Sequence, residues 1–399
     1  MSTKRRDSKN RILQNGESQR KDGRYMYKYI DCAGNTKYLY SWRLVRTDPI
    51  PKGCKDTVPL RDKIKVAQRD KEDGIISSGY EITVLELAEK YVAQKAGVKQ
   101  NTKRAYSFAL GILRKEPFGS RRIDKVKHSD AKGWLIKLQE EGLGYSSINL
   151  VRNVVKPAFE MAVNDDLLRK NPFSFPLMSV VMNDSVPREA ISEQQEEQFL
   201  TFLREDSYYN KYYDPVYILF HTGLRISEFS GLTISDLDMN QGIIKVDHQL
   251  QRSRGGKYFI TDTKTDCGTR IIPMTGGVKE CFRRILETRP KPEKEPVVDG
   301  KMGFLFLDKN GMPAAGGHWN SRFHEMCGRY NELHEKQIPM ITPHICRHTF
   351  CSNMAKAGMN PKTLQKIMGH SNIGITLNVY THIGFEDVKK EMLSVCNGL

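Results

Sequence analysis

The sequence predicts a multidomain protein with a small β-sheet domain first, an all-α domain second and a mixed α+β, mainly α, domain last. The chain has 399 residues, enough for two or three domains at roughly 150 residues each. Tyrosines that alternate with other residues near the N-terminus indicate strands, whereas apolar residues at helical spacing over 82–170 indicate packed helices. We therefore expect domains at residues 1–75, 82–175 and 187–399.

Residues 11–46 predict the small sheet. Aromatic residues alternate with other residues over 25–30 and again over 38–42, and a turn signal at 33–35 joins them into a hairpin. A third strand is expected at 11–14. One face is aromatic enough to pack on a helix.

The other face of the predicted hairpin carries the cations Arg24, Lys28 and Lys37. Such a face suits a sheet laid in the major groove of DNA, although a small sheet that only packs on its neighbours remains an alternative. A linker at 47–58 and a charged helix at 60–72 follow.

The all-α domain is expected to begin with a capping box at Thr83 and Glu86. Three more helices are predicted at 101–113, 129–139 and 146–163 from the spacing of apolar residues. The next segment, 171–191, holds three prolines and has no clear period, which predicts a linker before the last domain.

The charge balance favours a polyanionic partner. The chain has 63 Lys and Arg against 47 Asp and Glu, a formal net charge of +16. Residues 1–80 hold 19 basic and 10 acidic side chains, whereas residues 181–399 hold 27 and 26. We therefore expect the N-terminal part to hold a phosphate backbone and the C-terminal part to meet DNA with a few placed cations. A solubilising surface or an anionic membrane are the alternatives.

Cellular location follows from features that the sequence lacks. No apolar stretch approaches the roughly 18 residues needed to cross a bilayer, and the basic N-terminus is not followed by the apolar segment of a secretory signal. The eight cysteines show no pairing rhythm, which is typical of reduced thiols. We expect a cytoplasmic protein.

The first motif that could carry chemistry is TGLRISE, at 222–228. One helix is expected to end at Gly223 and the next to begin with Arg225 in its first turn. A guanidinium beside free backbone N–H groups can hold phosphate oxygens in a bidentate manner. Glu228, one turn on, could hold the arginine in place, and an ordinary surface ion pair is the alternative.

The second motif is HICRHTF, which places His344, Arg347 and His348 on one face of a helix. A histidine and an arginine side by side suit a phosphate that must be held while protons are exchanged. A zinc site that adds Cys346 and Cys351 is an alternative, but the ligands could not all share a face and the usual paired spacing is missing.

Three further residues are unremarkable when taken singly. Lys264 lies at a tight turn after a predicted hairpin, where a lysine can reach a bound backbone but is usually solvated. His370 ends a helix and could be a core histidine. Tyr380 is one of 17 tyrosines, and a phenol of pKa near 10 becomes a nucleophile only with local help.

Taken in order, these motifs resemble the tyrosine recombinase family of the phage-integrase type. The matching segments are TGLRISE, KT at 264–265, HICRHTF, GH at 369–370 and Tyr380. The chain as a whole is most similar to integrases of conjugative transposons. The resemblance implies an arm-site-binding domain for the sheet, a core-site-binding domain for the helical unit and a catalytic domain at 187–399.

The resemblance also implies roles for individual residues. Tyr380 would attack the scissile phosphate and form a 3′-phosphotyrosyl link, while Arg225 and Arg347 would hold its two non-bridging oxygens. Lys264 would protonate the leaving 5′-oxygen and His344 would take the tyrosine proton. The implied catalytic set is Arg225, Lys264, His344, Arg347, His370 and Tyr380, with Glu228 as an orienting residue.

His370 would hydrogen-bond a phosphate oxygen, and no cofactor or metal is expected because one phosphodiester bond is exchanged for another. Two such exchanges through a Holliday junction would excise or integrate a mobile element in double-stranded DNA, at its ends and its target site. The resemblance implies a tetramer on DNA, and we expect residues 384–395 to dock on a neighbouring protomer, with packing in cis as the alternative. An excision factor or a host DNA-bending protein are candidate partners.

Three other functions compete with this prediction. A type IB topoisomerase would use the same chemistry for relaxation, but would not need two additional domains for site choice. A catalytically inactive DNA-binding regulator would keep the fold, although the intact set of six residues speaks against it. A basic membrane-peripheral protein would need an amphipathic basic helix with a bulky apolar face, and the sequence has no strong candidate.

Overall fold

The computed structural model describes residues 5–31, 34–50, 58–73, 82–98, 100–185, 189–253, 255–263 and 266–380. The chain divides into two units, Met1–Val186 and Pro187–Leu399. Within the described ranges, no helix combines the length and the apolar character that a bilayer crossing requires.

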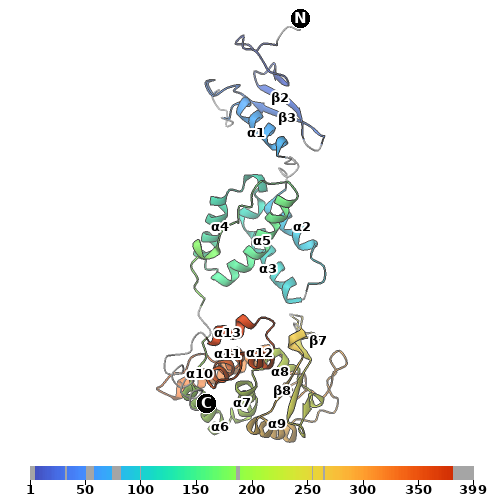
Figure 1. Cartoon of the computed structure of the whole chain (residues 1–399), viewed down its shortest axis with the longest axis vertical. Helices are drawn as coiled ribbons and strands as arrows, with labels where there is room; N and C mark the ends of the chain where they lie inside the picture. The colour runs from blue at the N-terminus through green and yellow to red at the C-terminus, as the bar shows by residue number, and fades with distance from the viewer. Residues whose placement is uncertain are drawn as a thin grey trace, which may run out of the picture. The chain divides into compact units, whose positions relative to one another are not determined.

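The first unit begins with a three-stranded antiparallel sheet in the order β1-β2-β3, covered on one face by a helix (Figure 1). The elements are β1 (Glu17–Gln19), β2 (Tyr25–Ile30), β3 (Thr36–Ser41) and α1 (Leu60–Glu72). Tyr25 points toward Leu60 and Ile64 of the helix and is buried with them. The alternation of tyrosines therefore gives one face that packs on α1, as predicted.

Two details of this sheet differ from the sequence prediction. The third strand is β1, after the Asn15-Gly16 turn, whereas residues 11–14 contribute only the isolated bridge between Arg6 and Ile12. Lys37 pairs with Tyr29, so it lies on the α1 face and not beside Lys28, which pairs with Tyr38 on the other face. Paired residues of neighbouring strands share a face, and the register of the hairpin therefore separates the two lysines.

The rest of the first unit is helical, as predicted. Its helices are α2 (Val84–Ala93), α3 (Gln100–Lys115), α4 (His128–Glu140), α5 (Tyr145–Asn164) and the short η2 (Pro117–Ser120), η3 (Ile123–Lys125) and η4 (Leu177–Ser179). Thr83 and Glu86 form the expected capping box at the start of α2.

The segment that follows α5 is not a linker throughout. Phe173, Phe175, Leu177 and Val181 are buried in the same core as the helices. The prolines of this segment stop it from forming a regular helix, but its alternating apolar side chains still fill space between α4 and α5. The helical core thus extends beyond the end of α5 at Asn164 and reaches Val181.

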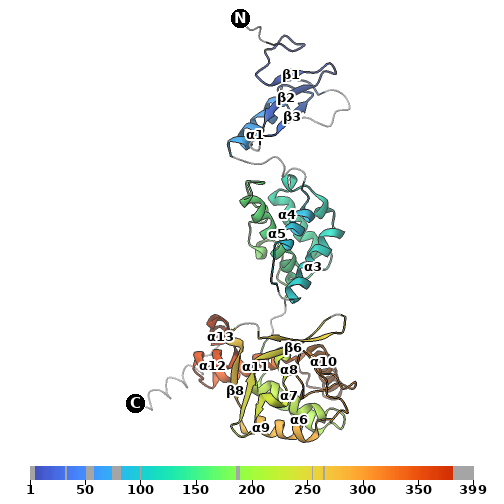
Figure 2. The same cartoon turned by 90° about the vertical axis from the view of Figure 1, so that its right-hand side faces the viewer.

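The second unit is mixed α+β and mainly helical, as predicted (Figure 2). Its helices are α6 (Glu193–Glu205), η5 (Asn210–Tyr212), α7 (Tyr213–Thr222), α8 (Ile226–Gly231), η6 (Ile234–Asp236), η7 (Asp266–Gly268), α9 (Gly276–Thr288), α10 (Gly316–Leu333), α11 (Pro343–Lys356), α12 (Pro361–Met368) and α13 (Ile373–Tyr380). Its strands are β4 (Leu237–Asp238), β5 (Ile243–Val246), β6 (His248–Arg252), β7 (Tyr258–Asp262) and β8 (Arg270–Pro273).

The strands of this unit form two small antiparallel sheets, one in the order β4-β5-β8 and one of β6 and β7. The main core gathers apolar side chains from α6, α7, α8, α9, α10 and α11 around Phe220, Phe229 and Phe282. Helix α12 contacts β8, and α13 contacts both α11 and α12 (Figure 2). This arrangement brings the ends of α7, α8, α11, α12 and β8 together.

Candidate active site

The first element of the site is the junction between α7 and α8. Gly223 ends α7 in the left-handed region, with φ of 63°. A Cβ atom at this position would lie 2.6 Å from Cδ1 of Phe350 and 2.8 Å from Sδ of Met368. Only glycine therefore lets the junction approach α11 and α12 this closely, and the carbonyl of Gly223 faces the site.

Arg225 is the N-cap residue of α8, one position before the first turn in which the sequence analysis placed it. Its backbone N donates to Oε2 of Glu228 at 2.9 Å, its Nη1 donates to Oε1 at 2.6 Å, and its Nη2 donates to the carbonyl of Gly369 at 2.7 Å. The guanidinium is therefore held on two sides, while about a third of the side chain remains exposed.

The Arg225–Glu228 pair is not an ordinary surface ion pair. The side chain of Glu228 is 1% exposed, and Arg270 of β8 donates to the same carboxylate at 2.8 and 3.2 Å. Burial alone would raise the pKa of Glu228, but the hydrogen bonds and charges of Arg270 and Arg225 hold it below its ordinary value. A charged carboxylate thus lies between two guanidinium groups.

Arg347 of α11 is buried beside this pair. Its Nη1 donates to the carbonyl of Gly223 and its Nη2 to the carbonyl of Met368. Burial, followed by the charge of Arg225, lowers the pKa of Arg347 to about 9. The guanidinium therefore keeps its proton at neutral pH, and the structure brings Arg347, Arg225 and Glu228 together as the sequence analysis expected.

The end of α12 accepts hydrogen bonds from three arginines in succession. The carbonyl of Ile367 accepts from Nε of Arg270 at 2.6 Å, that of Met368 from Arg347 at 2.5 Å, and that of Gly369 from Arg225 at 2.7 Å. These are carbonyls that a helix end leaves without intrahelical partners, at the negative end of its dipole.

His370 follows this carbonyl triplet directly and also lies at the site. Its Nδ1 is 3.0 Å from the hydroxyl of Thr376. Burial, followed by the charges of Arg347, Arg225 and Arg270, lowers the pKa of His370 to about 4. The imidazole is therefore neutral at pH 7, and when the Thr376 hydroxyl donates to Nδ1, Nε2 carries the proton and can donate to a phosphate oxygen.

Tyr380 ends α13, and it packs against a small apolar cluster that includes Phe350 of α11 and Leu364 of α12. Its hydroxyl donates to the backbone carbonyl of Met359, just after α11. His344 is exposed at the start of α11, with its ring centroid 5.4 Å from that of His348. Helix α13 thus packs on α11, which carries Arg347, and on α12, whose end anchors the arginines, but the hydroxyl of Tyr380 has a backbone partner.

Two predicted features lie outside the described residues. Lys264 is one of them, and the segment 384–395 is the other. Arg270, in contrast, is a residue of the site that the sequence analysis missed. The signal that could have identified Arg270 is the alternation of β8. Arg270 and Ile272 are buried, whereas Ile271 and Pro273 are exposed.

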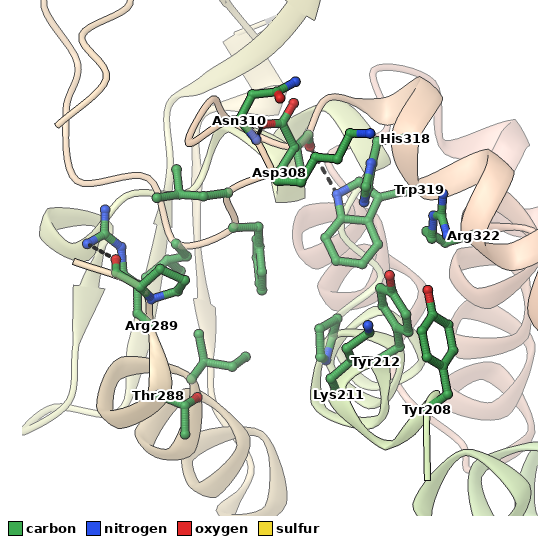
Figure 3. Close-up of a pocket in the computed structure, with 18 residues that line it drawn as sticks. Tyr208, Lys211, Tyr212, Thr288, Arg289, Asp308, Asn310, His318, Trp319 and Arg322 are labelled. Atoms are coloured by element: carbon green, nitrogen blue, oxygen red, sulfur yellow. Dashed lines mark hydrogen bonds between the residues drawn. The ribbon is translucent and has the colours of Figure 1, made fainter. Parts of the chain in front are cut away.

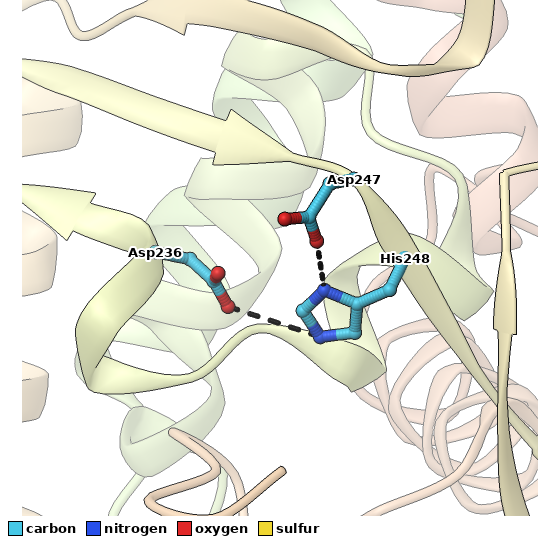
Figure 4. Close-up of side chains that lie close together, drawn as sticks. All are labelled: Asp236, Asp247 and His248. Carbon is cyan, nitrogen blue, oxygen red and sulfur yellow. Dashed lines mark hydrogen bonds and ion pairs between the residues drawn. The ribbon is translucent and has the colours of Figure 1, made fainter. Parts of the chain in front are cut away.

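The structure does not support the zinc alternative. Cys346 and Cys351 are buried, whereas His344 is exposed. Among the described residues, the group of metal-capable side chains that lie close enough together is instead Asp236, Asp247 and His248 (Figure 4).

The polar atoms of this second group already contact other atoms of the protein. Nδ1 of His248 contacts Asp247, and its Nε2 is 2.8 Å from the carbonyl of Gly231 at the end of α8. Asp236 accepts from the backbone and the hydroxyl of Thr233, both at 2.7 Å. Since both ring nitrogens already face oxygen acceptors, the cluster connects α8 to β6 and needs no ion to do so.

A cavity of about 680 Å³ lies elsewhere in the second unit, between α7, α9 and α10 (Figure 3). Tyr208, Tyr212 and Trp319 form aromatic walls, and Lys211 and Arg322 add positive charge. None of the predicted catalytic residues lines it. The cavity is therefore separate from the site that Arg225, Arg270 and Arg347 form, which we call the arginine site.

The N-terminal sheet presents a second cationic surface. Lys28 is exposed on the face opposite α1. The guanidinium carbon of Arg24 lies 5.9 Å from the ring centroid of Tyr40 and 5.5 Å from that of Trp42, and Arg24 also pairs with Asp22 at 2.7 Å. The aromatic rings therefore orient this cation beside Lys28's face of the sheet.

Comparison with family models gives two matches. Residues 1–71 match the DNA binding domain of Tn916 integrase, and residues 189–387 match the phage integrase family. The first match covers the small sheet with α1, and the second covers the whole arginine site.

Two curated relatives match along almost the full chain. The transposase from transposon Tn1545 of Streptococcus agalactiae and that from transposon Tn916 of Enterococcus faecalis are each 46% identical over 392 residues, which is 98% of this chain and 96% of theirs. Tyrosine recombinase XerC of Bacillus pumilus is 24% identical over 68% of this chain and 82% of its own.

Among solved structures, the Tn1549 transposon integrase in complex with transposon right end DNA is similar, with 44% identity and a TM-score of 0.74. The match covers 79% of this chain and 100% of that one. A lambda integrase tetramer bound to a Holliday junction, at 16% identity and a TM-score of 0.54, covers 92% of this chain and 95% of its own and shares the fold.

Proposed function

This chain belongs to the phage integrase family of tyrosine recombinases, and from that premise we propose how its residues carry out recombination. The chain is a site-specific DNA recombinase, an integrase of the conjugative-transposon type that acts in excision and integration. What remains to be assigned is the role of each residue at the arginine site.

The observation that carries the assignment is the fixed pair of guanidinium groups. Arg225 is anchored on the carbonyl of Gly369 after α12, and Arg347 is anchored on the carbonyls of Gly223 at the α7–α8 junction and Met368 at the end of α12. Both come from segments that are distant in sequence. Anchored donors lose little freedom when a phosphate arrives, which is the condition for stabilising charge that develops in a transition state.

In the proposed reaction, the oxygen of Tyr380 bonds to the scissile phosphorus and the bond to the 5′-oxygen breaks. Arg225 and Arg347 hold the two non-bridging oxygens, and neutral His370 donates a hydrogen bond to one of them. His344 takes the phenol proton. Lys264 gives a proton to the leaving oxygen, so a 3′-phosphotyrosyl link and a free 5′-hydroxyl result.

The reverse of this step, with the 5′-hydroxyl of another duplex, joins the exchanged strand. Because a phosphate ester is conserved at each stage, the proposal includes no cofactor and no metal. Two rounds of exchange through a Holliday junction complete recombination. The cationic face of the N-terminal sheet, with Arg24 and Lys28 as its candidate contacts, binds DNA at a separate site, whereas Lys37 lies on the α1 face.

Recombination of two duplexes requires several protomers, and we place four on the DNA, with residues 384–395 of each docked on a neighbour. This proposal is supported by the lambda integrase tetramer, whose fold this chain shares. An excision factor or a host DNA-bending protein would bias the direction. Since the substrate is bacterial DNA, the site of action is the nucleoid in the cytoplasm.

The decisive experiment is trapping of the covalent intermediate. A nicked duplex that carries a candidate element end loses the short strand after cleavage, so the wild-type chain should accumulate a protein–DNA adduct that survives denaturation. Tyr380→Phe should form no adduct while it binds the duplex with unchanged affinity. Tyr208→Phe, at an exposed tyrosine of the same unit, is the matched control and should form adduct normally.

The same experiment separates the competing functions. An inactive regulator would bind the duplex and yield no adduct from the wild-type chain. A type IB topoisomerase would form adduct on unrelated duplexes and relax unrelated plasmids without joining defined sites. Adduct from Tyr380→Phe would refute the assignment of the nucleophile.

A further inference from the structure

Arg270 belongs to the arginine site, but the proposed reaction gives it no role. It begins β8, shortly after the KT motif at 264–265, and its side chain is 1% exposed. A buried guanidinium is costly unless its N–H groups find acceptors. The hydrogen-bond acceptors of Arg270 therefore indicate which parts of the site it positions.

The first of these acceptors is Glu228. Nη2 of Arg270 donates to Oε2 at 2.8 Å and Nη1 to Oε1 at 3.2 Å, which forms a bidentate pair. Each oxygen of Glu228 also accepts from Arg225. The plane and the position of the carboxylate are thus fixed because both of its oxygens accept from both arginines.

The other acceptors are backbone carbonyls at the end of η7 and near the end of α12. Nη1 donates to the carbonyl of Gly268 at 2.9 Å, and Nε donates to that of Ile367 at 2.6 Å. Gly369 allows this close approach, since a Cβ there would lie 3.2 Å from Nη1 of Arg270. One side chain therefore connects the turn before β8, the carboxylate of α8 and the end of α12.

We propose that Arg270 is a positioning residue for strand cleavage: it orients Arg225 through Glu228 and fixes the α12 end that also anchors Arg225. It does not touch the DNA itself. This inference rests on the proposed function, because it concerns the alignment of a group that holds the scissile phosphate. A lysine at this position would keep the charge but lose the planar fork that holds both oxygens of Glu228.

The test is the rate of adduct formation by the full-length chain under single-turnover conditions, on the nicked duplex described above. Arg270→Lys should bind the duplex with unchanged affinity and cleave it on the order of 100-fold more slowly, because small misplacements of a positioned group have effects of that size. Arg289→Lys is the matched control. Arg289 is also buried and bidentate, with Glu295 at 2.7 and 2.8 Å, but it lies outside the site.

A double substitution distinguishes positioning from general loss of structure. If Arg270 acts through Arg225, the effect of Arg270→Lys should shrink to a few-fold in an Arg225→Lys background, since the group that it aligns has already lost its fork. Should Arg270→Lys fail to fold, Arg270→Gln, which keeps one donor group, is measured against the same criterion.

The outcomes distinguish failure of the role of Arg270 from failure of the proposed function. Equal cleavage by wild type and Arg270→Lys, an equal loss in Arg289→Lys, or a full 100-fold loss in both Arg225 backgrounds would each overturn the positioning role. Absence of adduct from the wild-type chain would refute the proposed function itself, and the role of Arg270 with it.

Discussion

The cations of the arginine site and those of the N-terminal sheet are held in opposite ways. Arg347 and Arg270 are buried and donate to backbone carbonyls, and Arg225 is anchored on one as well. Lys28 is exposed, and Arg24 stacks on aromatic rings. In the proposed function, the second unit thus acts through a few fixed charges at near-zero net charge, whereas the sheet acts through charge at its surface.

This difference predicts that conservative changes are severe at the arginine site and mild on the sheet. Arg225→Lys keeps the charge but loses the bidentate fork. We expect cleavage on the order of 100- to 1,000-fold slower, with DNA affinity nearly unchanged. Single-turnover adduct formation and a binding isotherm measure the two quantities.

The control for this prediction is Arg283→Lys, which changes an exposed arginine paired with Glu280 on α9. It should cleave at the wild-type rate. If Arg225→Lys lost binding and cleavage in equal proportion, Arg225 would be an ordinary surface contact and the comparison would fail.

The close approach at Gly223 predicts the next largest effect, on stability. Gly223→Ala must accommodate both a left-handed φ and a Cβ 2.6 Å from Phe350, whereas Gly242→Ala has a similar φ of 66° and open space around it. We expect about 1 kcal/mol lost at Gly242 and roughly 1–3 kcal/mol more at Gly223. Urea unfolding of the two variants measures the difference, and equal losses would contradict it.

The pH dependence of stability sharpens the comparison further. Since the pKa of His370 is about 4 in the folded chain and near 6.5 when unfolded, the unfolded state binds more protons between these values. The stability that this histidine contributes is therefore present above about pH 6.5 and lost as the pH falls toward 4. Thermal unfolding from pH 4.5 to 7.5 should show a shallower decline for His370→Gln than for wild type.

The smallest effects are expected on the sheet. Lys28→Ala should weaken duplex binding a few-fold and reduce the slope of log affinity against log salt by about 1. Lys37→Ala, on the α1 face, should change the slope less. Cleavage of bound DNA should be unaffected in both, and a larger effect at Lys37 would show that the wrong face had been assigned.

The sequence motifs predicted most of the described residues of the site, whereas contacts between segments distant in sequence could not be predicted. Arg225, Glu228 and His370 lie at helix ends that a cap or a glycine marks in the sequence, and Arg347 follows the cap at Thr342 by five residues. Arg270 carried no such signal, since its role depends on a contact with Glu228 that is 42 residues away. The sheet register that separates Lys28 from Lys37 was also hidden, because turn composition does not determine which residues of the two strands pair.

The fold could be predicted where apolar residues have a strong helical period. It was predicted less well where prolines indicated a linker. The helices of the first unit follow from apolar spacing, and α1 has the predicted bounds of Leu60–Glu72. The segment around Phe173 has the prolines of a linker but lies in the core, because its aromatic side chains gain more from burial than its irregular backbone loses.

The bond between the hydroxyl of Tyr380 and the carbonyl of Met359 has a consequence for the behaviour of the protein in the cell. A phenol that donates there must exchange this acceptor before its oxygen can reach phosphorus. In the proposed mechanism, the free protein in the cell therefore keeps its tyrosine in a resting contact, and the loss of this bond adds about 1 kcal/mol to the cost of the first step.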